Sequence, residues 1–223
     1  MAISAARNGE GERDAPRTPP PVVSRTGPRR SESARLAVLR AADDLLVERG
    51  FDGVTVEGIA ARAGVSKQTI YRWWKSKVDI LLDTIADDAP EALAWEGGRG
   101  TPEEELKAQL RRVADFLASP PGQVLQALLG HAQLDERTAR RLREGFVREQ
   151  RERDLAGLRA VLARHAGAEL DRETGSEVEA ATAERLLDAL LGPLYHQVLV
   201  QGQVPGPEFT DAVAEWVLEL ASR

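Results

Sequence analysis

Apolar residues recur along most of this chain with the spacing of α-helices. In the segment from residue 56 to 63, for example, Val56, Ile59 and Ala63 occupy the i, i+3 and i+7 positions of one helix face. After residue 32, the alternation of apolar and polar residues that marks half-buried strands is nearly absent. The pattern therefore predicts an all-α fold.

Start and stop signals divide this pattern into about nine helices. Gly50 and Gly64 stand where helices end, and Ser66 and Ser76 can cap the helices that follow them. Thr101 is followed by a proline and, three residues on, by a glutamate, which is typical of a helix N-terminus. The predicted helices cover residues 33–49, 55–63, 66–74, 76–88, 101–118, a segment from 119, and then 135–165, 174–201 and 206–220.

Residues 1–32 lack helical periodicity and are rich in proline and arginine. Such a segment buries too little apolar surface to offset its ordering entropy, so we expect a disordered arm. Its arginines at positions 17, 25, 29 and 30 have no acidic neighbour between residues 16 and 31. Three interpretations stay open: a solubilising tail, the product of a mis-assigned start site, or an arm that touches a DNA backbone or minor groove.

The amino-acid composition excludes several classes of protein. The 223 residues are 42% hydrophobic and 30% charged, close to globular averages. No run approaches the roughly 18 apolar residues of a membrane span, and no apolar signal-peptide segment begins the chain. We therefore expect a cytoplasmic protein with no membrane partner.

The residues that usually perform catalysis or bind metals are scarce. Cysteine is absent, and the three histidines at 131, 165 and 196 are too far apart to form a local metal motif. The phosphate-loop, dinucleotide, zinc-protease and nucleophile-elbow motifs do not occur. We expect no enzyme activity, no catalytic residue, no metal site and no cofactor.

Charge divides the chain into two parts. Residues 1–80 carry 14 Lys and Arg against 10 Asp and Glu, whereas residues 81–223 carry 16 against 26, and the whole chain has a net charge of −6. A basic segment attracts a polyanion and an acidic one repels it. The first part is therefore where nucleic-acid contacts are expected.

The segment from Thr55 to Lys77 has the construction of a helix-turn-helix. Two predicted helices meet at a short turn containing Gly64, where φ can be positive. If Ile70 and Trp74 face the core, the spacing of 100° per residue turns Gln68 and Arg72 outward. Such a polar face suits base edges and phosphates in a major groove. An ordinary helical hairpin with a solvated face is the alternative.

At these residues the chain resembles the TetR family of bacterial transcriptional regulators. The family pattern ILxAAxxLFxExGFxxTT is matched by VLRAADDLLVERGFDGVT at Val38–Thr55. The pattern IAxxAGVSxxTxYxxFxSKxxL is matched by IAARAGVSKQTIYRWWKSKVDIL at Ile59–Leu81. Trp74 replaces the usual phenylalanine and Val56 a common second threonine, and both changes keep the bulk or β-branching of the side chain.

The resemblance implies a three-helix DNA-binding domain at residues 33–80 and a larger helical domain at 81–223 for dimerisation and effector binding. It implies major-groove contacts from Lys67, Gln68, Thr69 and Tyr71, with Arg72 as an additional contact. It implies phosphate contacts from Thr55, Tyr71, Trp73 and Lys77. The implied function is a ligand-responsive repressor that binds a palindromic DNA operator as a homodimer.

Two apolar stripes near the C-terminus form the candidate dimer interface. A two-fold dimer would place two recognition helices about one DNA turn apart, and four helices packed across the axis would bury both stripes. The alternative is that the stripes belong to the core of one chain. The candidate residues are Leu186, Leu190, Leu194, Val213, Trp216, Val217 and Leu220.

Aromatic residues and histidines of the larger domain are the candidate contacts for a small-molecule effector. Their composition favours a mostly apolar ligand, but each is equally compatible with a core or surface role. The candidates are Trp95, Phe116, His131, Phe146, Tyr195 and His196. The alternative function is a helix-turn-helix protein that organises chromosome structure without an effector.

Overall fold

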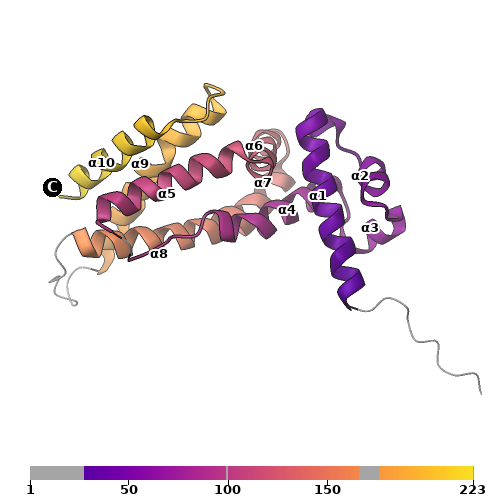
Figure 1. Ribbon diagram of the computed structural model, residues 1–223, viewed down its shortest axis with the longest axis horizontal. Helices are drawn as coiled ribbons and strands as arrows, with labels where there is room; N and C mark the ends of the chain where they lie inside the picture. The colour runs from indigo at the N-terminus through magenta and orange to yellow at the C-terminus, as the bar shows by residue number, and fades with distance from the viewer. Residues whose placement is uncertain (1–27, 99, 166–175, 223) are drawn as a thin grey trace, which may run out of the picture.

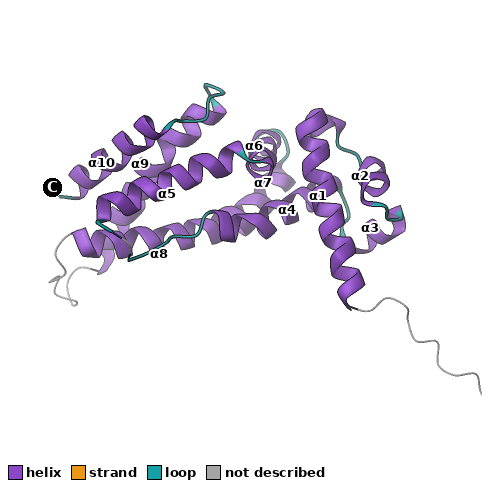
Figure 2. Ribbon diagram, in the orientation of Figure 1, coloured by secondary structure: helices purple, strands orange, loops and turns teal. Residues whose placement is uncertain are grey.

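The computed structural model describes residues 28–98, 100–165 and 176–222, and within these ranges every regular element is helical (Figures 1 and 2). The all-α prediction is confirmed. The elements are α1 (Pro28–Gly53), α2 (Val56–Ala63), α3 (Lys67–Trp73), α4 (Lys77–Ala92), α5 (Pro102–Ala118), α6 (Pro120–Ala132), α7 (Glu136–Leu142), the π-helical turn η1 (Arg143–Val147), α8 (Arg148–His165), α9 (Ser176–Leu199) and α10 (Pro207–Ala221).

Several helix boundaries differ from those that the sequence predicts, and α4, for example, ends at Ala92 rather than at residue 88. Two differences change the organisation of the chain. α1 begins at Pro28, so residues 28–32 are helical although they were assigned to the disordered arm, whose remainder lies outside the described residues. The helix predicted over residues 135–165 is divided at Gly145, whose backbone (φ −99°, ψ −107°) is not helical. Helical periodicity continues on both sides of this glycine, which is why apolar spacing alone does not reveal the interruption.

The described helices form two packed groups joined by α4. Figure 1 shows α1, α2 and α3 at one end and α5, α8, α9 and α10 at the other, with α4 leading from one group to the other. α1 packs against α2, α4 and α6, and α5 packs against α6, α8 and α10. No helix of the described ranges has the length and apolar character needed to cross a membrane.

The C-terminal leucine stripe is buried within the core of this chain, in agreement with the alternative interpretation of the stripe. α9 and α10 lie against each other and against α5, so their apolar faces are buried without a second subunit. The buried members of the predicted interface are Leu186, Leu190, Leu194, Val213 and Val217. Leu220 is half-buried, and Trp216 remains 49% exposed on the outer face of α10.

One buried carboxyl group opposes the packing of α1. Asp43 is 9% exposed, and its Oδ1 atom has no hydrogen-bond partner in the described part of the chain. Burial, together with the neighbouring carboxylates of Asp88 and Asp44, raises the pKa of Asp43 from 3.8 to about 7. The side chain therefore favours the folded state when protonated and disfavours it when ionised.

We expect the Asp43→Asn substitution to stabilise the protein at alkaline pH. Because the folded pKa of Asp43 is raised, the folded state binds this proton more tightly, and the associated stability is lost as the pH rises through about 7. The variant should melt about 2–6 °C higher than the parent at pH 8 and by a smaller margin at pH 5, because the loss of stability begins at the unfolded pKa of 3.8 and is complete only above about 7. Thermal melts at both pH values test this.

Asp52→Asn is the matched control, because it removes the same charge from an exposed residue of α1 that does not contribute to the raised pKa of Asp43. An equal rise of the melting temperature at both pH values in the Asp43 variant would contradict the assignment.

Candidate nucleic-acid interface

The helix-turn-helix is fixed by side-chain caps and one left-handed glycine. Thr55 caps α2 by accepting a hydrogen bond from the Gly58 amide at 3.0 Å, and Ser66 caps α3 by accepting one from the Thr69 amide at 3.1 Å. Between them Gly64 adopts φ 67°, ψ 29°, a conformation that costs a residue with a Cβ atom about 1 kcal/mol. The sequence thus encodes both the end of α2 and the start of α3.

The two faces of α3 differ as predicted. Ile70 and Trp74 are buried in the core that α3 shares with α1 and α2. Gln68 and Arg72 are exposed, and Tyr71 is 53% exposed. Figure 1 shows α3 at the outer edge of the molecule, so its polar face is open to a partner as large as a DNA duplex.

The C-terminal end of α3 is attached to α4 by polar contacts. The Trp74 Nε1 atom donates a hydrogen bond to the Asp83 carboxylate at 2.7 Å, and the Lys75 amide donates one to Asp79 at 2.9 Å. Asp79 also forms an ion pair with Arg141. Any tilt of α4 is therefore transmitted to the end of α3.

The basic side chains near α3 differ in how far their charge is neutralised. Lys67 pairs with Glu57 on α2 at 3.2 Å, and both groups are exposed, so this ion pair is weak. The Arg72 guanidinium lies over the Trp73 ring, 5.2 Å from its centroid. Stacking leaves the hydrogen-bond donors at the edge of the guanidinium available to a phosphate.

Lys77 has a structural contact that its place in the motif does not reveal. Its Nζ atom donates a hydrogen bond to the Phe51 carbonyl at 2.7 Å and lies 4.3 Å from the centroid of the Phe51 ring. The side chain therefore joins the start of α4 to the end of α1. Only one of its three N–H donors is used in this bond, so a phosphate contact remains compatible with it.

Comparison with known proteins agrees with this geometry. The family model for bacterial regulatory proteins of the tetR family matches residues 38–84, and the model for the tetracyclin repressor-like C-terminal domain matches residues 98–217. An uncharacterized HTH-type transcriptional regulator, YdeS of Bacillus subtilis, is 34% identical over 179 residues, which are 80% of this chain and 85% of YdeS. The chain belongs to the TetR family.

Two further relatives extend the similarity over the whole TetR fold. The DNA-binding transcriptional repressor TetR of Mycobacteroides abscessus is 30% identical over 192 residues, which are 79% of this chain and 97% of that protein. The crystal structure of the TetR family transcription regulator SCO0332 superposes with a TM-score of 0.64 at 30% identity, and the match covers 84% of this chain and 97% of that one. The protein is thus a helix-turn-helix transcriptional regulator of this family.

The six candidate effector contacts do not converge on one cavity. Phe116 is buried in the core, and His196 is exposed beside Gln201. His131 lies against the Phe51 ring with the ring centroids 4.5 Å apart, so it packs on the DNA-binding part. Phe146 lines the cavity of about 210 Å³ described below.

The remaining two candidates, Trp95 and Tyr195, lie near Asp154, a buried carboxylate that sequence analysis missed. The Trp95 Nε1 and Gln150 Nε2 atoms each donate a hydrogen bond to Asp154 Oδ1 at 3.0 Å. Burial raises the pKa of Asp154 despite these bonds, and burial raises the pKa of Tyr195 to about 12. The Trp95 ring also lies so close to Gly157 that a Cβ atom there would fall 2.1 Å from it.

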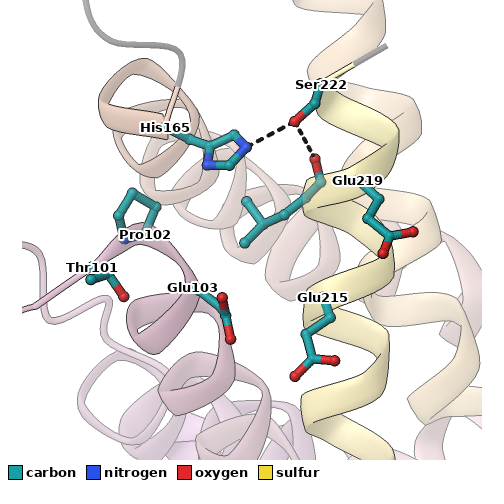
Figure 3. Close-up of a pocket in the computed structure, with 8 residues that line it drawn as sticks. Thr101, Pro102, Glu103, His165, Glu215, Glu219 and Ser222 are labelled. Atoms are coloured by element: carbon teal, nitrogen blue, oxygen red, sulfur yellow. Dashed lines mark hydrogen bonds between the residues drawn. The ribbon is translucent and has the colours of Figure 1, made fainter.

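Two cavities open on the surface of the larger part. One of about 450 Å³ lies between the start of α5 and the ends of α8 and α10, where His165 contacts Ser222 (Figure 3). The other, of about 210 Å³, lies between α4 and the α7–η1–α8 segment. Among the described residues, no group of His, Asp and Glu side chains is arranged to hold a metal ion.

We expect the Gly64→Ala substitution to destabilise the turn and to weaken DNA binding. A Cβ atom disfavours the left-handed backbone by about 1 kcal/mol, which corresponds to a melting temperature about 2–4 °C lower. Thermal melts and DNA titration measure the two effects. Gly97→Ala is the control, since Gly97 is exposed and its Cβ position is open. Equal behaviour of the two variants would contradict the role of Gly64.

Proposed function

We propose that this TetR-family regulator is a ligand-responsive repressor that binds a palindromic DNA operator as a homodimer. One observation carries the proposal: α3 buries Ile70 and Trp74 and presents Gln68, Tyr71 and Arg72 at the outer edge of the molecule. An outward polar face on a capped helix is the geometry with which helix-turn-helix proteins enter a major groove. In this proposal residues 33–80 bind DNA and residues 81–223 dimerise and bind an effector.

We propose that one set of side chains contacts base edges and another contacts phosphates. Groups that reach base edges give sequence specificity, whereas groups that contact phosphates fix the position of the helix. The base-facing set is Lys67, Gln68, Thr69 and Tyr71. The phosphate set is Thr55, Tyr71, Trp73 and Lys77, and Arg72 is an additional contact beside the base-facing set.

We expect Gln68→Ala and Tyr71→Phe to separate these roles. Loss of the amide should lower affinity for a DNA duplex selected by the protein from a random pool by about 1–3 kcal/mol, or roughly tenfold to a hundredfold, and should leave random DNA unaffected. Tyr71 belongs to both sets through different groups: we assign its ring to the base edges and its hydroxyl to a phosphate. Loss of the exposed hydroxyl alone should therefore weaken both duplexes by the same small factor, because phosphate contacts carry no sequence information. Fluorescence anisotropy with both duplexes measures the effects.

Both residues are exposed, so neither substitution disturbs the core. The division of roles fails if Gln68→Ala lowers the affinity for selected and random DNA equally. A parent protein that does not discriminate selected from random DNA would refute operator binding itself.

Dimerisation is proposed through the outer faces of α9 and α10. Leu199 and Trp216 are 45% and 49% exposed, and Leu191 and Leu220 are half-buried beside them on the same two helices. A contiguous exposed patch of large apolar side chains marks a protein interface, and we propose that these four residues form one. A two-fold pairing would cover them and set the spacing of the two α3 helices.

We expect Trp216→Glu to yield a folded monomer that no longer binds the operator. Because Trp216 is exposed in the single chain, the charge does not enter the core, but it would be desolvated at the interface. Sedimentation velocity and circular dichroism measure association and folding. Leu134→Glu is the control, since Leu134 is 90% exposed on the α6–α7 connection. An intact dimer of the Trp216 variant would place the interface elsewhere.

An effector is favoured over the chromosome-organising alternative by one observation. The cavity of about 210 Å³ lies directly against α4, the helix that carries α3. A ligand that binds one tilt of α4 better than another would shift the spacing between two α3 helices and so release the DNA. We propose this regulatory role in place of any catalytic one.

A further inference from the structure

The cavity beside α4 lies where α4 and the α7–η1–α8 segment face each other with small residues, Ala86 and Gly145. α4 contributes Leu82, Ala86 and Pro90 at intervals of four, and the α7–η1–α8 segment faces them with Gly145 and Phe146. A Cβ atom built on Gly145 would meet no atom within 4 Å. The space is therefore open because Ala86 and Gly145 have almost no side-chain volume, and its walls at these residues are apolar.

Charged side chains line the rest of this cavity, and they differ in how they are paired. Asp83 accepts the hydrogen bond of Trp74, and Arg141 pairs with Asp79. Arg153 donates from its Nε and Nη2 atoms to the neutral amide oxygen of Gln150, at 3.2 and 2.9 Å. No carboxylate within the described ranges lies within ion-pair distance of Arg153, so this guanidinium keeps its full charge at the cavity.

We propose that this cavity binds a small organic carboxylate of about one ring in size, with its carboxylate held by Arg153 and Arg141 and its apolar body against Ala86, Pro90 and Phe146. The proposal deepens the effector role proposed above and rests on it. Guanidinium groups are the preferred partners of carboxylates because their planar donors match both oxygens.

The bound carboxylate would compete with Asp79 for Arg141. Asp79 holds the Lys75 amide at the α3–α4 junction, and Asp83, on the cavity wall, holds the indole of Trp74 at the end of α3. Of the lining residues, Asp83 is thus one contact away from the end of the recognition helix, and Arg141 is connected to the junction through Asp79. A ligand that draws Arg141 from Asp79 favours a different junction geometry, which is the differential affinity that a switch requires.

Substitution of Glu149 distinguishes an anionic ligand from a cationic one. It lines the same cavity and is exposed, so it repels an anion and attracts a cation. Replacing it with glutamine therefore shifts affinity in opposite directions for the two classes of ligand.

The experiment compares benzoate, benzamide and benzylamine, which share one ring and differ in charge. Calorimetric titration of the full-length protein should detect benzoate at millimolar concentration and neither of the other two. Arg153→Gln should weaken benzoate binding by about tenfold or more, the effect of one charged hydrogen bond. Glu149→Gln should strengthen it. Arg148→Gln, which removes the same charge from α8 outside the cavity, is the control and should change nothing.

Two cavity-filling variants test the location. Ala86→Leu and, as a second variant, Gly145→Leu should abolish benzoate binding while the circular dichroism spectrum stays that of the parent. In titrations with the selected DNA duplex, benzoate should lower the affinity of the parent and should leave that of Arg153→Gln unchanged.

The inference is overturned if benzylamine or benzamide binds as well as benzoate, if the filled variants still bind benzoate, or if bound benzoate leaves DNA affinity unchanged. The proposed DNA-binding function fails separately, when the parent protein does not discriminate its selected DNA in the absence of any compound.

Discussion

The burial of α4 on both sides is the constraint on which the rest of the structure depends. Ile80, Leu81 and Ile85 are fully buried, and the helix packs against α1 of the DNA-binding part and against α5 and α6 of the larger part. Close-packed apolar contacts tolerate only small shifts before they must repack as a unit. A rigid helix shared by two cores therefore converts a local change on one side into a displacement on the other.

Sequence patterns predicted the DNA-binding part well because its signals are local. Thr55, Gly64 and Ser66 act on backbone groups within a few residues of themselves, so their roles follow from their order in the chain. Helical spacing likewise separates Ile70 and Trp74 from Gln68 and Arg72 without knowledge of the partner helices. The contact of Lys77 with the Phe51 carbonyl escaped prediction, since it joins residues that are far apart in sequence.

The packing of the larger part was predicted less completely, because an apolar stripe on a helix does not indicate which helix or subunit covers it. Leu190 and Trp216 belong to similar stripes, yet Leu190 is fully buried within the chain and Trp216 is half exposed. The difference lies in the packing of α9 and α10 against each other and against α5, which no periodicity encodes. In the same way, the candidate effector residues were chosen by type, and only tertiary packing decides that Phe146 reaches a cavity while Phe116 does not.

The close approach of Gly157 to Trp95 limits which sequences this architecture can adopt. Any other residue at position 157 would displace the indole, and the buried Asp154 carboxylate would then lose one of its two side-chain hydrogen-bond donors. A change at 157 would therefore weaken the hydrogen bonding of Asp154 unless that carboxyl group were also replaced by a neutral residue. A half-buried glycine of α8 thus couples its own replacement to that of a carboxylate in the interior.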